Sequence, residues 1–353
     1  MTRTVKVKDA ILEGMHSCME RDERVYVMGL GVPDPKGMFG TTLGLQETFG
    51  VERAFDIPTS ENGMTGVAIG SALVGRRPIL IHQRVEFALL AVEQMVNQAA
   101  KWHYMFGGRA RVPLVVRLVV GRGWGQGAQH SQSLQSWFAH IPGLKVVLPA
   151  TAADAKGLLI ASIEDDNPVV FIEHRWLHET FGEVPEGHYS VPLGKARVAR
   201  EGDAVTIVAC SYMVLEALKA AEVLSAAGIE AEVVDLRTIA PYDHETVMTS
   251  VRKTGRLLVT DIDWKHAGFA AEVISRVVEE DLQALKAAPR RACVVDVPRP
   301  TSRALAPLCS PRARQLVDHV RELLELPPEA IPIPADLDPE NLDAPNPEFK
   351  GPF

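Results

Sequence analysis

The chain of 353 residues is long enough to form two domains, each with a hydrophobic core of its own. Its composition, 46% hydrophobic and 23% charged, is typical of a globular protein. A net charge of -8 at pH 7 argues against a protein that binds nucleic acid or an anionic membrane surface.

Cysteine usage and hydropathy exclude further classes. The four cysteines lie far apart and form no CxxC pair, which argues against a metal site or a disulfide framework. The N-terminal segment has no apolar core of the signal-peptide kind. The longest apolar run, residues 112–120, is interrupted by Arg117 and is too short to span a bilayer. We therefore expect a cytoplasmic protein with no membrane partner.

Three segments of the first half carry helical patterns. Apolar residues at helical spacing predict a helix over residues 5–21. Good helix formers throughout predict one long helix over residues 87–104. Thr151 followed by Asp154 is typical of a capped helix start, and that helix is expected to end near Asp165.

Between these helices lie short apolar segments rich in β-branched residues, which predict buried strands. Near-continuous apolar strands that alternate with helices indicate a parallel sheet covered on both faces. The expected strands cover residues 24–32, 53–58, 77–83, 112–120, 144–149 and 168–174.

A second α/β pattern follows a stretch rich in glycine, proline and charge. Four apolar strands, ending with residues 292–298, alternate there with three helices, which indicates a second doubly wound domain. We expect a first domain over residues 1–180, a linker with short strands over 181–202, and a second domain over 203–326. The proline-rich, acidic tail over residues 327–353 is expected to be extended or disordered unless it docks on a partner.

Two short motifs offer titratable groups in expected turns. In TSENGMTG, Thr59–Gly66, Glu61 lies where an expected strand passes into a glycine-spaced helix. In QHSQS, Gln129–Ser133, His130 follows a glycine-rich loop. A carboxylic acid and an imidazole on loops at strand ends are what acid–base chemistry requires. The glycines at 63, 66, 70 and 75 indicate close helix packing, within the chain or across a subunit interface.

Five segments in this order resemble one known family: FDIPTSENGMTG, EQMVNQAAKWHYMFGG, QHSQSLQSWFAHIPGLKVVLPATAADAKGLL, DDNPVVFIEH and VDLRTIAPYD. The chain resembles the beta subunit of the thiamine diphosphate-dependent decarboxylase component of 2-oxo acid dehydrogenase complexes, of the pyruvate, branched-chain and acetoin types. The resemblance spans about residues 5–325. It implies two doubly wound, three-layer α/β domains, a pyrimidine-binding domain and a transketolase C-terminal-like domain.

The resemblance also implies that the chain is half of an enzyme. In the family the cofactor lies between two chains, and the alpha chain holds the diphosphate and its magnesium ion. The present sequence has no GDG followed by NN, the family's diphosphate motif. The implied partners are an alpha subunit, in an α2β2 heterotetramer, and a lipoyl-bearing acyltransferase.

Several residues take roles by resemblance. Glu61 matches the glutamate that hydrogen-bonds a ring nitrogen of the aminopyrimidine, and Phe87 matches the aromatic residue that stacks on that ring. His130 matches the histidine near the reacting carbon, and Gln129 beside it is assigned to the cofactor. Relatives hold a structural potassium ion, mostly through backbone oxygens, at the positions of Leu114, Asp165 and Asn167.

Each role has a plainer alternative. Glu61 is also the acid that a helix N-terminus favours. Phe87 is also a core aromatic at a helix start, and His130 an ordinary loop histidine. For the whole chain, the alternatives are a two-chain transketolase-like or acyloin-forming carboligase subunit and a non-catalytic scaffold or regulatory paralogue.

Three segments depart from the family pattern. GLGV, Gly29–Val32, replaces GEDV, and LLVTDID, Leu257–Asp263, replaces the common LVVEE. HQRVEF, His82–Phe87, replaces a run with an acid and aromatics. Arg84 in this run is a candidate for binding a carboxylate or phosphate, with a solvated surface arginine as the alternative. These departures leave the substrate open.

Overall fold

A computed structural model of the chain describes residues 2–122, 125–302 and 304–337. By their contacts, the described residues divide into two compact units. The first contains residues 2–122 and 129–193, and the second contains residues 125–128 and 194–337. None of the described helices combines the length and apolar character needed to cross a bilayer.

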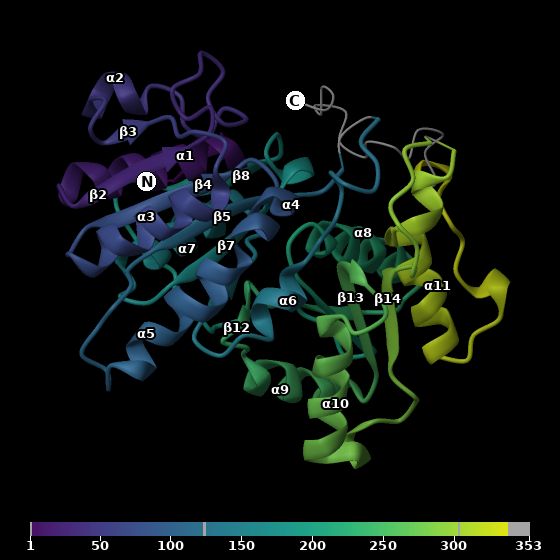
Figure 1. Cartoon of the computed structure of the whole chain (residues 1–353). Coiled ribbons are helices and arrows are strands. Elements are labelled where there is room, and N and C mark those ends of the chain that lie inside the picture. The colour runs from purple at the N-terminus through teal and green to yellow at the C-terminus, as the bar shows by residue number, and fades with distance from the viewer. Residues whose placement is uncertain (1, 123–124, 303, 338–353) are drawn as a thin grey trace. The chain divides into compact units, whose positions relative to one another are not determined.

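The first unit is built on a parallel sheet with the strand order β6-β7-β5-β4-β2-β3 (Figure 1). Most of its strand residues are buried, as the apolar runs predict. The prediction of a parallel sheet is confirmed. The strands are β2 (Val25–Gly29), β3 (Ala54–Phe55), β4 (Arg77–His82), β5 (Val115–Val120), β6 (Lys145–Val147) and β7 (Val169–His174).

Helices of the first unit begin where the sequence signals them. α1 (Val7–Arg21) and α7 (Ala152–Glu164) pack on each other. At the start of α7 the Thr151 hydroxyl accepts a hydrogen bond from the Asp154 amide at 3.1 Å, so the predicted cap is confirmed. α3 (Glu61–Leu73) packs on β4 and on the helical segment over residues 89–99. Two shorter helices, α2 (Leu45–Phe49) and α6 (Gln135–Ala139), carried no clear sequence signal.

The single long helix expected over residues 87–104 is wrong in its detail. The segment consists of α4 (Val85–Ala88), a 3-10 turn η1 (Leu89–Ala91), a π-helical stretch η2 (Gln94–Ala99) and α5 (Ala100–Met105). Helix-forming residues determine that the backbone coils, but not the spacing of its hydrogen bonds. π-helical turns are rare and are frequently found at functional sites.

The expected linker contains two short strands. β8 (Phe181–Pro185) pairs antiparallel with β1 (Thr2–Lys6), with Thr2 opposite Pro185. A 3-10 turn, η3 (Arg175–Leu177), precedes β8. β9 (Arg197–Arg200) belongs to the second unit, where it pairs antiparallel with β11.

The second unit carries a five-stranded sheet in the order β14-β13-β10-β11-β9, parallel except for β9. Two helix pairs contact its strands, α8 with α11 and α9 with α10. The pattern predicts β10, β11, β13, β14 and the helices α8, α9 and α10, but neither β9 nor α11. The bounds are β10 (Val205–Ala209), α8 (Met213–Ala226), β11 (Ala231–Asp235), β12 (Thr238–Ala240), α9 (His244–Thr254), β13 (Leu257–Trp264), α10 (Phe269–Asp281), η4 (Leu282–Ala284), β14 (Arg290–Val294), η5 (Ala306–Cys309) and α11 (Ala313–Leu323).

The start of the expected tail forms two 3-10 turns, η6 (Pro328–Ala330) and η7 (Ala335–Leu337). The rest of it, residues 338–353, lies outside the described part of the chain.

Candidate active site

Glu61 is the first residue of α3. The turn before it, residues 56–60, leads out of β3, so the side chain lies near the carboxyl ends of the parallel strands. Ligands of open α/β sheets bind at these strand ends. The Thr65 hydroxyl donates a 2.7 Å hydrogen bond to the Glu61 carbonyl and braces this first turn.

A narrow pocket brings Glu61 and Phe87 together. The end of β4 contributes Ile81 and His82 to its wall. Its cavity volume is about 10 Å³, far below the range of about 300–1,000 Å³ that is usual for small-molecule sites. This chain therefore supplies a wall for a ligand rather than an enclosure. The lining residues are Leu30, Ile57, Pro58, Thr59, Glu61, Ile81, His82, Gln83 and Phe87.

His82 is a pocket residue to which the sequence assigned no role. It is 3% exposed, and its Nε2 atom is buried without a hydrogen-bond partner among the described residues. Burial lowers the pKa of His82 to about 4, so the ring is neutral at pH 7. A neutral imidazole nitrogen without a partner is suited to a hydrogen bond with a ligand. The signal was the position of a histidine at the end of an otherwise apolar strand.

Phe87 also contacts His130. Their ring centroids lie 5.6 Å apart with an interplanar angle of 86°, an edge-to-face arrangement. Phe87 thus connects the pocket of Glu61 with the QHSQS loop. His130 is exposed, and so is Gln129, whose side chain makes no hydrogen bond with another described residue.

Two further side chains next to Phe87 hold the QHSQS loop. Arg84 is 3% exposed and is therefore not a solvated surface arginine. Its guanidinium donates hydrogen bonds to the carbonyl oxygens of Gly121 at 2.6 Å and His130 at 2.9 Å. Glu86 accepts a 2.6 Å hydrogen bond from the Gln132 amide. Burial raises the pKa of Glu86 despite this bond.

Two of the three departures from the family pattern meet at the pocket. Leu30, from GLGV, and His82 and Gln83, from HQRVEF, all line it. The Gln83 amide donates to the Leu30 carbonyl at 3.1 Å. Gly29 is required there, because a Cβ atom would lie 2.7 Å from the Ile81 carbonyl oxygen. The third departure, LLVTDID, lies in β13 of the second unit.

The residues expected around potassium lie just before the amino ends of β5 and β7. Asp165 and Asn167 occupy the turn between α7 and β7, where the Asp165 carboxylate accepts from the Asn167 amide at 2.9 Å. The Leu114 carbonyl accepts a hydrogen bond from Val169 at 2.9 Å. Arg77 donates to the Asp165 carbonyl at 3.1 Å. Among the described residues, no three or more His, Cys, Asp or Glu side chains are arranged to hold a metal ion.

Comparison with protein families matches both units. Residues 3–179 match the transketolase pyrimidine-binding domain, and residues 194–316 match the transketolase C-terminal domain. A solved structure described as a split gene transketolase, inactive beta4 tetramer, superposes with a TM-score of 0.74 at 25% identity. The match covers 91% of this chain and 99% of the chain in the solved structure.

Curated relatives match over nearly the whole chain. The beta subunit of acetoin:2,6-dichlorophenolindophenol oxidoreductase from Cupriavidus necator is 43% identical over 335 residues, which are 92% of this chain and 99% of the relative. The mitochondrial pyruvate dehydrogenase E1 component subunit beta of Caenorhabditis elegans is 42% identical over 92% of this chain and 93% of the relative. The corresponding subunit of Rickettsia bellii is 41% identical over 90% of this chain and 98% of the relative. The chain therefore belongs to the family of transketolase-like beta subunits that includes the pyruvate dehydrogenase E1 and acetoin oxidoreductase beta subunits.

Proposed function

We propose that this chain is the beta subunit of a thiamine diphosphate-dependent 2-oxo acid dehydrogenase that decarboxylates its substrate and transfers the acyl group. The observation that supports this most directly is the continuous set of Glu61, Phe87 and His130. Glu61 and Phe87 share one pocket, and Phe87 contacts His130 edge to face. The family of the chain includes the pyruvate dehydrogenase E1 beta subunits, whose name states this kind of activity.

The groups that line this pocket suit one side of the aminopyrimidine half of the cofactor. It offers a carboxyl group, an aromatic ring and the buried Nε2 of His82, which has no partner among the described residues. A nitrogen heterocycle can form hydrogen bonds with the carboxyl group and with the His82 nitrogen, and it can stack on the aromatic ring. Thiamine diphosphate, when bound, supplies the electron sink for cleaving the bond next to a 2-oxo group.

Each residue then has a physical task. Glu61 holds a proton at its carboxyl group opposite a ring nitrogen, and Phe87 stacks on the ring and excludes water from it. His130, braced by Phe87 and by the contact of Arg84 with its carbonyl, holds a proton on the substrate side. Gln129 contributes a hydrogen bond on the cofactor side.

The small cavity supports a site shared between chains. We assign the diphosphate and its magnesium ion to an alpha subunit, in an α2β2 assembly, and the acyl group to a lipoyl-bearing acyltransferase. The cytoplasm is the compartment we propose, which fractionation of the host cell tests. A potassium ion at Leu114, Asp165 and Asn167 would share the Asp165 carbonyl with Arg77. If it is bound, thermal stability is higher in potassium chloride than in equimolar sodium chloride.

The decisive experiment replaces Glu61 with Gln in the tetramer reconstituted with its alpha subunit. The Glu61→Gln amide keeps the shape but cannot exchange the proton, so we expect decarboxylation to fall by about a hundredfold or more. Glu47→Gln is the matched control, because Glu47 is an exposed acid in the first turn of α2. Near-normal activity of Glu61→Gln would sink the proposed role. A tetramer that bound no cofactor at all would favour a non-catalytic paralogue.

A transketolase-like carboligase subunit is the second candidate, because the solved structure described above is a split transketolase. The two activities differ in the acceptor. Reductive acylation of a lipoyl domain supports the dehydrogenase, and ketol formation from an aldehyde without a lipoyl acceptor supports the carboligase.

A further inference from the structure

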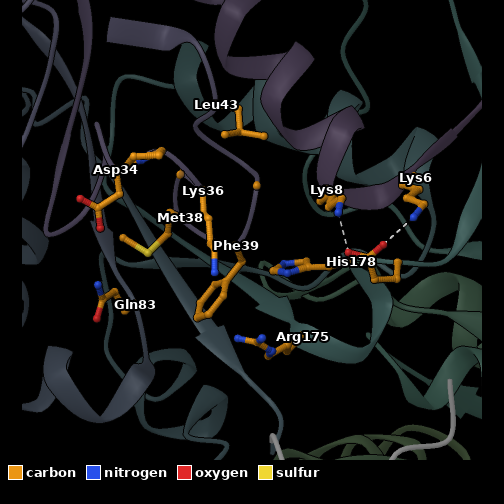
Figure 2. Close-up of a pocket in the computed structure, with 14 residues that line it drawn as sticks. Lys6, Lys8, Asp34, Lys36, Met38, Phe39, Leu43, Gln83, Arg175 and His178 are labelled. Atoms are coloured by element: carbon orange, nitrogen blue, oxygen red, sulfur yellow. Dashed lines mark hydrogen bonds and ion pairs between the residues drawn. The ribbon is translucent and has the colours of Figure 1, made fainter. Parts of the chain in front are cut away.

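A second and much larger hollow lies in the first unit, with a cavity volume of about 750 Å³ (Figure 2). This volume lies within the range of about 300–1,000 Å³ that is usual for small-molecule sites. Three parts of the chain line it: the junction of β1 with α1, the loop over residues 34–43, and residues 175–179 after β7. Gln83 lines both this hollow and the pocket of Glu61. Nothing in the proposed function uses this hollow.

The lining is electropositive. It contains four cations, Lys6, Lys8, Lys36 and Arg175, against two carboxylates, Asp34 and Glu179, which leaves a formal charge of +2 (four minus two). Both Lys6, at 2.6 Å, and Lys8, at 2.5 Å, bind the single carboxylate of Glu179 (Figure 2).

Glu179 is ionised. Its burial opposes ionisation, but the hydrogen bonds from Lys6 and Lys8 outweigh this effect and lower the pKa of Glu179. One carboxylate therefore balances only one of the two ammonium charges. Lys36 is exposed and forms no ion pair with another described residue.

The position of the two lysines is locally unfavourable. Lys6 is the N-cap of α1 and Lys8 lies in its first turn, at the positive end of the helix dipole. The first amides of the helix cannot bind an external anion, because Val7 donates to the Thr180 carbonyl and Lys8 to the His178 carbonyl. Glu179 offsets only part of the repulsion between the two lysines and the helix N-terminus, so a further anion near them would be favourable.

The floor of the hollow is buried and polar. Arg175 is 6% exposed, and its guanidinium lies 4.0 Å from the centroid of the Phe39 ring. Burial lowers the pKa of Arg175 to about 9, so it remains a cation at pH 7. Figure 2 shows Arg175, Phe39 and His178 close together, and the ring centroids of Phe39 and His178 lie 6.2 Å apart.

His178 adds a polar atom that needs a partner. The side chain is 3% exposed, and its Nε2 atom is bonded to the Glu173 carboxylate at 3.0 Å. Its Nδ1 atom is buried and has no hydrogen-bond partner in the described part of the chain. The Arg117 guanidinium forms an ion pair with the Glu173 carboxylate at 2.6 Å, so Glu173 in turn holds the His178 ring in place. A buried nitrogen of this kind is costly unless a ligand satisfies it.

Phe39 supplies an apolar surface in a strained position. Its φ of 53° lies in the left-handed region, which is unusual for an aromatic residue. Met38 and Leu43 add further apolar surface to the lining. Strained residues cluster at ligand sites.

From this geometry we propose that the hollow binds a phosphomonoester with an apolar organic group. A phosphomonoester carries about -1.5 to -2 charges at pH 7, which matches the formal +2 of the lining. A ligand with a single carboxylate would leave one positive charge of the lining uncompensated. The phosphate contacts Lys8, Lys36, Arg175 and the Nδ1 edge of His178, and the organic group lies against Phe39.

The test uses calorimetric titration of the full chain at low ionic strength, where exposed cations are least screened. Phenyl phosphate is expected to bind at one site per chain, about tenfold or more tighter than benzoate, because the lining offers two net positive charges rather than one. Lys36→Gln is expected to weaken this binding several-fold. Since Lys36 is exposed, this variant keeps the fold. Arg175→Gln is the stronger but structurally riskier variant.

Lys219→Gln is the matched control, because Lys219 is an exposed lysine on α8 of the second unit. It is expected to leave binding unchanged. Equal binding of benzoate and phenyl phosphate, no binding at all, or equal weakening by Lys36→Gln and Lys219→Gln would each overturn the proposal. So would loss of binding in the α2β2 assembly. Binding that persists in Glu61→Gln separates this site from the proposed active site.

Discussion

His82 and Glu86 lie four residues apart, and burial shifts the pKa of each side chain in the direction that favours its neutral form. It lowers that of His82 to about 4 and raises that of Glu86. Both lie beside Phe87, so the environment of the candidate cofactor site disfavours charge. A low-charge, water-poor setting is what proton exchange with a ring nitrogen requires.

The burial of His82 predicts how stability changes with pH. Its folded pKa, about 4, lies below the ordinary value of 6.5, so the unfolded chain binds the proton first as the pH falls. This contribution to stability is complete above pH 6.5 and is lost as the pH falls toward 4. We expect the wild type to lose about 2 kcal/mol more than His82→Leu between pH 7 and pH 5.

Chemical denaturation at the two pH values measures this difference. His266→Leu is the control, because His266 is exposed. If the wild type and His82→Leu change stability equally between pH 7 and pH 5, His82 is not the buried neutral group described above.

The sequence alone indicated Glu61 and His130 as an acid and an imidazole at strand ends, but it indicated their roles, and Phe87, only through the resemblance. It did not indicate that Phe87 contacts His130. The sequence did not indicate Glu86, because nothing in the pattern of a helix shows that an acid has its partner in the backbone N–H of Gln132, 46 residues away. It left Arg84 open between a ligand contact and a surface position, because burial is decided by tertiary packing.

At the scale of elements, α4 and the residue before it hold the QHSQS loop at three points. Arg84 binds the His130 carbonyl, Glu86 binds the Gln132 amide, and Phe87 packs on the His130 ring. We infer that α4 positions His130, and that these bonds matter more for turnover than for cofactor affinity.

Glu86→Ala is therefore expected to lower kcat by about tenfold, with little change in the affinity for thiamine diphosphate. Glu86→Gln keeps an acceptor oxygen for the Gln132 amide and is expected to recover most of the loss. Steady-state kinetics of the reconstituted enzyme measures both. Glu93→Gln, an exposed glutamate of the same helical segment, is the control. Wild-type kcat in Glu86→Ala, or no recovery in Glu86→Gln, would contradict a positioning role.

Regular elements were predicted where local signals are strong. The cap at Thr151 marks α7, and Asp243 caps α9 by accepting from the Thr246 amide. The π-helical stretch was not predicted, because the signal for it is not local. By contrast, α11 carried a readable signal: its buried residues Ala313, Leu316, Val317, Val320 and Leu323 recur at helical spacing.

At the scale of the whole molecule, one face of α3 lies bare in the described chain. Gly63, Val67, Gly70 and Val74 recur at helical spacing, and no atom lies within 4 Å of a Cβ built on Gly70. Val67 is 56% exposed and Val74 is 81% exposed. The described chain offers no close packing partner at Gly70, so we propose that this face makes a subunit contact in the α2β2 assembly.

Val67→Glu is expected to weaken this assembly, because it places a charge in an apolar contact. Sedimentation velocity of the reconstituted protein measures the loss of tetramer. Val51→Glu, at a residue that is 68% exposed outside α3, is the control. A tetramer population unchanged by Val67→Glu would exclude this face as the contact.

The antiparallel pairing of β1 with β8 has a consequence for synthesis. The first strand of the chain, Thr2–Lys6, has its partner only when Phe181–Pro185 has been made. α1, which follows β1 directly, likewise packs on α7, more than 130 residues further along the chain. Contacts between distant residues form late, because closing a long loop costs entropy. On the ribosome, β1 must therefore remain without its partner strand until Phe181–Pro185 has emerged.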